Sequence, residues 1–233
     1  MILSTLVRYY DRLAEQEDSD IAPLGFSRQK ISFIILLNSD GSLSALQDAR
    51  VEDGGRMIPR QIVVPGQAKP SGSGINPGFL WDSSQYMLGF KGEDPKPERT
   101  LQAFEAFRDR HLELEKEIDD KAYSAVCAFL RVWLPKDAAS YDKLAEIATA
   151  FGVFRLVGAR EFVHERSKVK EYWLGQSNAD ADAPQAPSLI SGKMQQIARL
   201  HEPKIKGIRG AQTSGAALVS FNDDAYESYG KSQ

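Results

Sequence analysis

The chain has 233 residues, 29 basic and 32 acidic side chains, a formal net charge of −3 and 42% hydrophobic residues. This composition is typical of a globular protein with a sizeable core, and it argues against a chain that coats nucleic acid through bulk charge. One cysteine, Cys127, excludes an internal disulfide, and no apolar run approaches the roughly 18 residues of a membrane helix. The N-terminus lacks the features of a signal peptide, so we expect a cytoplasmic protein without a membrane partner.

Apolar periodicity predicts the first elements of the chain. Residues 2–16 carry an apolar stripe with steps of three and four residues, which is typical of an amphipathic helix. The run at 31–37 predicts a buried strand, and Asp40-Gly41 predicts a tight turn into a partner strand. A third strand is predicted at 61–64.

Residues 65–78 are predicted to form a loop. The segment holds seven chain breakers, namely Pro65, Gly66, Pro70, Gly72, Gly74, Pro77 and Gly78. This density of proline and glycine is incompatible with a helix or a central strand. Since a loop of this length inside a compact domain is usually functional or disordered, it is a candidate site.

The middle of the chain is predicted to be helical. A helical stripe begins at residue 98 and the helical pattern continues to about residue 134, with a second helix at 123–133 and a third at 140–151. The acidic cluster between residues 113 and 120 is accompanied by Lys116 and Lys121, so we interpret it as a solvated helix face rather than a metal site.

Short strands are predicted at 153–157, 161–164 and 169–174, followed by a surface linker at 177–188. Strand-rich and helix-rich stretches are segregated along the chain, which favours an α+β fold with an antiparallel-type sheet and a helical insertion around residues 98–151. We expect one domain over residues 1–233, with a sheet-rich part at 20–95, a helical part at 98–151 and a mixed part at 152–233.

The sequence lacks the motifs of common catalytic chemistry. The three histidines, His111, His164 and His201, are scattered, so no zinc site with ligand pairs at short spacing is present. There is no P-loop and no nucleophile elbow, and the glycines of the predicted loop miss the dinucleotide-binding fingerprint. We therefore expect no catalytic residue, no metal and no cofactor.

Two segments, 54–81 and 203–222, each carry three cations and no aspartate or glutamate. The cations are Arg56, Arg60, Lys69, Lys204, Lys206 and Arg209. An acid-free surface suits a polyanion, and the glycines, serines and asparagine of the loop suit a narrow groove or a phosphate. The alternatives are a protein contact, or core segments with a few solvated cations.

Longer strings in the sequence are more specific than its composition. They include PLGFSRQKISF at 23–33, SGINPGFLWD at 73–82, IARLHEPKIKG at 197–207 and GAQTSGAALVSFN at 210–222. In this order they resemble the N-terminal part of the large subunit of the type I-C CRISPR surveillance complex, Cascade. Because the large subunits of that family are longer, the chain resembles an N-terminal fragment without the C-terminal helical region.

The resemblance implies a non-catalytic subunit that recognises the protospacer-adjacent motif (PAM) on double-stranded DNA and supports target unwinding in antiviral defence. The implied partners are PAM-bearing target DNA, the crRNA, the subunit that holds the 5′ handle of the guide, the backbone subunits and a recruited nuclease-helicase. Two alternatives stay open. One is a nuclease or phosphodiesterase of a defence system, and the other is a scaffold that holds partner proteins without touching DNA.

With this resemblance, the loop is expected to enter the PAM duplex from the minor groove. Its predicted DNA-binding residues are Lys69, Ser71, Gly72, Ser73, Gly74 and Asn76. Lys69 is expected to contact a phosphate, and the Asn76 amide to read base edges, unless Lys69 is merely solvated and Asn76 caps a turn. Contacts to the nucleic-acid backbone are predicted for Arg56, Arg60, Arg199, Lys204, Lys206 and Arg209.

Overall fold

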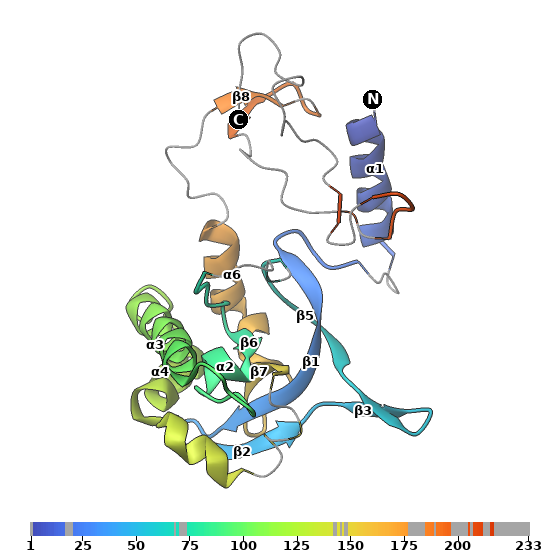
Figure 1. Ribbon diagram of the computed structural model, residues 1–233. Helices are drawn as coiled ribbons and strands as arrows, with labels where there is room; N and C mark the ends of the chain where they lie inside the picture. The colour runs from blue at the N-terminus through green and yellow to red at the C-terminus, as the bar shows by residue number, and fades with distance from the viewer. Residues whose placement is uncertain are drawn as a thin grey trace. The chain divides into compact units, whose positions relative to one another are not determined.

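The computed structural model describes residues 2–16, 21–67, 69, 74–141, 144, 146, 149–176, 185–188, 190–196, 205, 207–211 and 215–216. The chain divides into two compact units, Ala22–Ala179 and a second unit made of Met1–Ile21 with Asp180–Gln233. The first unit contains the main sheet and the longest helix (Figure 1). The assignment of residues 1–233 to one N-terminal domain stays a prediction.

A mixed five-stranded sheet forms the centre of the first unit. Its strands are β1 (Phe26–Leu37), β2 (Leu43–Asp48), β5 (Arg60–Pro65), β6 (Trp81–Ser83) and β7 (Phe151–Leu156). β1 pairs antiparallel with β5 through its first half and with β2 through its second half. It also pairs in parallel with β7, which pairs antiparallel with β6. The predicted α+β class is confirmed, but the sheet is mixed rather than wholly antiparallel because β1 and β7 run parallel.

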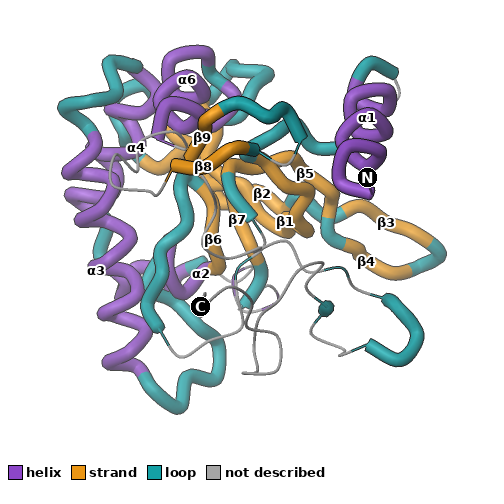
Figure 2. Tube along the Cα trace, turned by 90° about the horizontal axis from the view of Figure 1, so that it is seen from above, coloured by secondary structure: helices purple, strands orange, loops and turns teal. Residues whose placement is uncertain are grey.

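The core lies on both faces of β1, which explains the continuous apolar run at 31–37. On one face, Phe33, Ile35 and Leu37 join the large apolar cluster with residues of α3 (Pro97–Leu114) and α4 (Lys121–Val132). On the other face, Ile31 and Ile34 join a smaller cluster. Figures 1 and 2 show α3 and α4 side by side at one side of the strands.

The helical insertion is interrupted between α3 and α4. α4 begins after Asp120, whose Oδ1 accepts hydrogen bonds from the backbone N–H groups of Ala122 (2.8 Å) and Tyr123 (3.1 Å). Three carboxylates of the acidic cluster form ion pairs: Glu115 with Arg131, Asp119 with Lys168 and Asp120 with Arg166. The short helix α2 (Ser84–Met87) follows β6, and a 3₁₀ helix, η1, spans Pro135–Ser140. Of the predicted helix at 140–151, Leu144 and Glu146 are helical and Phe151 begins β7, whereas residues 142, 143, 145, 147 and 148 lie outside the described residues.

The predicted strands at 161–164 and 169–174 are wrong. Val163–Glu165 forms a 3₁₀ helix, η2, and Ser167–Gln176 forms α6. The β-branched and aromatic residues of the second stretch suggested a strand. However, Val169, Tyr172 and Trp173 stand at helical spacing, and all three pack against the large apolar cluster. In this stretch the helical spacing of the apolar residues decides the structure, although the residue types favour a strand.

A hairpin that the sequence did not predict projects from the first unit. β3 (Val51–Asp53) pairs with β4 (Arg56–Ile58), and all of their residues are exposed. Gly54 and Gly55 form the turn with φ values of 56° and 77°, a region that other residues rarely adopt. Figure 1 shows this β3–β4 arm extending away from the sheet.

The second unit holds α1 (Ile2–Ala14), which confirms the predicted N-terminal helix, and a hairpin of β8 (Gln185–Pro187) and β9 (Met194–Gln196). β8 replaces the end of the predicted linker. An isolated bridge joins Ile205 and Ala216. None of the helices in the described ranges combines the length and the apolar character that a membrane span requires.

Candidate nucleic-acid interface

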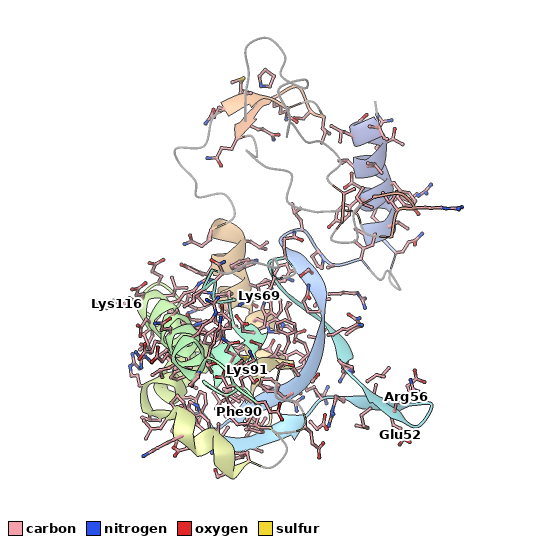
Figure 3. All side chains as sticks on the ribbon, viewed as in Figure 1. Glu52, Arg56, Lys69, Phe90, Lys91 and Lys116 are labelled. Carbon is pink, nitrogen blue, oxygen red and sulfur yellow. The ribbon has the colours of Figure 1, made fainter. Side chains whose placement is uncertain are left out.

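The glycine-rich loop joins β5 to β6. Residues 74–80 form neither helix nor strand, which agrees with the predicted loop, whereas Ser71, Gly72 and Ser73 lie outside the described residues. Figure 3 shows Lys69 in the body of the first unit. The described part of the loop is fastened to the fold by polar contacts from β6, α2 and α3.

Asp82, on β6, is the buried anchor of the loop. Its Oδ2 accepts a hydrogen bond from the Gly78 N–H (2.7 Å), and its Oδ1 accepts one from the Ser83 N–H (2.6 Å). The Lys69 ammonium forms an ion pair with Oδ2 and lies 3.5 Å from the centroid of the Tyr86 ring. Burial raises the pKa of Asp82 and lowers the pKa of Lys69. A contact of Lys69 with phosphate stays a prediction, and in this structure the ammonium has two partners within the protein.

Helices α3 and α2 hold the backbone of the loop. Arg110, on α3, donates from Nη1 to the Pro77 carbonyl oxygen, and Arg99 donates from Nη2 to the Gly74 carbonyl oxygen over 3.5 Å. The Tyr86 hydroxyl, on α2, accepts from the Asn76 N–H at 3.3 Å. These contacts fix the main chain around Asn76 and involve no atom of its side chain.

Asn76 lies at the surface of the first unit. It is exposed, whereas its neighbours Ile75 and Pro77 are partly buried. Gly74 is also exposed, and a Cβ atom there would lie 3.1 Å from Asn76 Nδ2. The Asn76 side-chain amide is therefore exposed on a backbone that hydrogen bonds hold in place. That this amide reads base edges stays a prediction.

The loop ends at a buried histidine that the sequence did not connect with it. The Leu80 N–H donates to Nε2 of His111 (3.0 Å), and Nδ1 of His111 donates to the Phe107 carbonyl oxygen (2.7 Å). These two contacts require a neutral imidazole. Leu80 has a φ of 61°, so this hydrogen bond holds a backbone conformation that leucine rarely adopts.

His111 and His164 are expected to make stability fall in mild acid. Burial lowers the pKa of each from 6.5 to about 4. Between these values the unfolded chain takes up protons that the folded chain does not, so the free energy of unfolding decreases as pH falls from 6.5 to 4. Two such groups contribute a slope of about 2.7 kcal/mol per pH unit. Urea unfolding at several pH values measures this slope of the free energy of unfolding against pH.

A pair of glutamine substitutions provides the control for this pH dependence. Glutamine offers a donor and an acceptor but does not titrate, so His111→Gln with His164→Gln should flatten the slope, and each single change should remove about half of it. A slope that is the same in the double variant would show that other groups cause the acid sensitivity.

Further exposed cations stand on the paired parts of β1 and β5, residues 26–31 and 60–65, which we call the β1–β5 ribbon. Arg28, Lys30 and Arg60 are exposed there. Because side chains alternate along strands, Arg28 and Lys30 lie on one face, and Arg60, which is opposite Ile31, lies on the other. Both strands of the ribbon lack acidic residues.

Sequence reasoning missed Arg28 and Lys30, although the same signal would have found them. Residues 21–39 also contain no aspartate or glutamate. Within this third acid-free segment, the apolar pattern predicts only the buried strand at 31–37. The pairing of β1 with β5 brings it next to the acid-free segment 54–81.

Of the other residues predicted to contact the nucleic-acid backbone, the structure describes Arg56 and Arg209, which belong to different units. Arg56 is exposed on the β3–β4 arm, as Figure 3 shows, and Arg209 is exposed in the second unit. Arg199, Lys204 and Lys206 lie outside the described residues. In the described ranges, no three histidine, cysteine, aspartate or glutamate side chains gather closely enough to hold a metal ion.

The comparison with known families decides the identity of the chain. Residues 6–233 match the family described as CRISPR-associated protein Cas_Csd1. The chain belongs to the CRISPR-associated Csd1 family. This is the family of the large subunit of type I-C Cascade, a structural subunit that is generally non-catalytic. No curated protein matches the sequence. The matched residues include all three acid-free segments and the glycine-rich loop.

Proposed function

We propose that this Csd1-family protein recognises the PAM on double-stranded target DNA and supports unwinding of the target. In RNA-guided complexes, base pairing with the guide reads the target, and a protein subunit reads a short motif on the duplex. The observation that carries the proposal is the glycine-rich loop, in which an exposed Asn76 stands on a backbone that Arg110, Tyr86 and Asp82 hold in place.

The shape of the loop suits the minor groove. That groove is only about 6 Å wide, so a helix cannot enter it, whereas a chain rich in glycine can. The asparagine amide carries both a donor and an acceptor, which is what discrimination of A·T from G·C pairs requires. The proposed reading set is Ser71, Gly72, Ser73, Gly74 and Asn76. Lys69, which the sequence also places in this set, is paired with Asp82 at the base of the loop.

The β1–β5 ribbon and the β3–β4 arm are proposed to contact phosphates outside the PAM. Arg28, Lys30 and Arg60 on the ribbon, and Arg56 on the arm, are exposed cations. Neutralising a phosphate releases a counterion, and this gives affinity without sequence preference. Arg199, Lys204, Lys206 and Arg209 are proposed to form a further contact with DNA or with crRNA.

The partners of the protein are proposed from its family. They are PAM-bearing DNA, the crRNA, the subunit at the 5′ handle, the backbone subunits and a nuclease-helicase recruited after target binding. No observation favours the alternatives of a nuclease or a scaffold that avoids DNA.

Equilibrium binding tests this proposal directly. Complexes reconstituted with and without this subunit are titrated with PAM-bearing duplex and with a duplex whose PAM is scrambled. The subunit should confer a preference for the PAM-bearing duplex. A preference that is the same without the subunit would refute PAM recognition by this chain.

The salt dependence of binding tests the ribbon. We expect the double variant Arg28→Ala, Lys30→Ala to bind PAM-bearing and scrambled duplexes more weakly by a similar factor. The slope of log K against log salt should fall by about 2 units, because each lost phosphate contact removes about 0.9. Lys116→Ala with Lys121→Ala, two exposed lysines near the turn between α3 and α4, is the matched control. An equal loss in that control would mean that net charge, and not the ribbon, causes the effect.

A further inference from the structure

We propose that the ion pair between Lys69 and Asp82 closes the glycine-rich loop at its base and thereby positions Asn76 for reading. This inference rests on the proposed function, in which the loop meets the PAM duplex. It makes Lys69 a positioning residue that acts through Asp82 and Tyr86, and not a residue that contacts DNA.

Asp82 joins the two ends of the loop. Lys69 stands before residues 70–77 and Gly78 stands after them, and both contact the same carboxylate oxygen, Oδ2. A loop whose ends are held together has fewer conformations than an open one. The shared oxygen therefore reduces the ordering that the loop must undergo when it binds.

Tyr86 connects the same two parts of the loop a second time. The Lys69 ammonium lies 3.5 Å from the centroid of the Tyr86 ring, and the Tyr86 hydroxyl accepts a hydrogen bond from the Asn76 N–H at 3.3 Å. Lys69 and the residue proposed to read the PAM thus contact one side chain. A displacement of Lys69 removes a neighbour of the group that holds the Asn76 backbone.

Burial explains why Lys69 stays with Asp82. The Asp82 side chain is fully buried, and the Lys69 side chain is 21% exposed. Separating a buried ion pair leaves a carboxylate without its partner, which is strongly unfavourable. The guanidinium of Arg110, which holds the Pro77 carbonyl, adds a second positive charge in this region. The buried carboxylate is therefore compensated and does not repel DNA.

Three variants in the reconstituted complex test this role: Lys69→Ala, Asp82→Asn and the double change. Each should reduce the preference for PAM-bearing over scrambled duplex about tenfold, with an unchanged slope of log K against log salt. The double variant should lose no more than the single variants, because either change opens the same closure. Lys69→Arg, which keeps a cation for Asp82 and Tyr86, should restore most of the preference.

A direct phosphate contact gives the opposite pattern. Lys69→Ala would then weaken binding to both duplexes equally and lower the salt slope by about 1 unit, and Asp82→Asn would not reproduce it. Additive losses in the double variant would also overturn the proposal. Lys91→Ala, at a lysine in the segment between α2 and α3, controls for the loss of one positive charge.

Unfolding measurements without DNA separate the ion pair from the proposed function. Urea unfolding of the same variants gives the coupling between Lys69 and Asp82, and non-additive losses are expected. Additive losses would overturn the closure whatever the DNA results. A second outcome is that Lys69 and Asp82 are coupled in unfolding, but the PAM preference is unchanged in every variant, including Asn76→Ala. This outcome would support the ion pair and refute PAM reading by this loop. If Lys69 and Asp82 are coupled but only Asn76→Ala loses the PAM preference, the positioning role of Lys69 is overturned.

Discussion

Asn76→Ala is expected to reduce the preference of the complex for PAM-bearing over scrambled duplex by about 1–3 kcal/mol, or roughly 5- to 150-fold. The side chain is exposed, and the contacts that hold the loop at Tyr86, Asp82 and Arg110 use other atoms. The substitution should therefore remove the reading amide and leave the loop in place. Equilibrium titrations of both duplexes at one fixed salt concentration measure the ratio.

Asn38→Ala provides the control for this substitution. Asn38 is an exposed asparagine in the turn between β1 and β2, where its amide donates to the Ser42 hydroxyl at 2.9 Å. It should leave the preference for PAM-bearing duplex unchanged. If Asn76→Ala behaves like Asn38→Ala, the loop is a structural element and the PAM is read elsewhere.

The choice of PAM substitutions sharpens the same experiment. In the minor groove A·T and T·A pairs display the same acceptors, whereas G·C adds an amino donor. The unaltered complex should therefore tolerate an exchange of A·T for T·A better than the introduction of G·C. Asn76→Ala should bring the two kinds of substitution closer together.

Gly78→Ala is expected to lower the free energy of unfolding by about 3 kcal/mol and to weaken PAM recognition as well. A Cβ atom at Gly78 would overlap the backbone carbonyl oxygen of Trp81 and lie 3.2 Å from Asp82 Oδ2. Trp81 is a buried residue of β6, so the sheet cannot move aside cheaply. Urea unfolding and DNA titration of one preparation measure both effects.

Gly175→Ala is the matched control for a glycine substitution. Gly175 is exposed in α6, and apart from its chain neighbours and the backbone of its own helix no atom lies within 4 Å of a Cβ placed there. Alanine favours a helix by about 1 kcal/mol over glycine, so this variant should be as stable as the unaltered chain or more stable. A Gly78→Ala chain with ordinary stability would contradict the close packing at the base of the loop.

The sequence by itself determined the features that depend on local pattern. The N-terminal helix, the buried strand at 31–37 with its Asp40-Gly41 turn, and the breaker-rich loop were all predictable, because residues near in sequence produce the periodicity or remove it. The ordered strings along the chain identified the family, since their joint occurrence needs no knowledge of contacts.

Only the tertiary structure decided which charges are available. Lys69 and Lys30 look alike as cations in acid-free segments, yet Lys69 is paired with buried Asp82, whereas Lys30 is exposed on the β1–β5 ribbon. Likewise, Arg110 and His111 reach the loop from α3, more than thirty residues along the chain from their partners. Ion pairing and burial depend on residues that folding brings together, and no local pattern in the sequence records those distances.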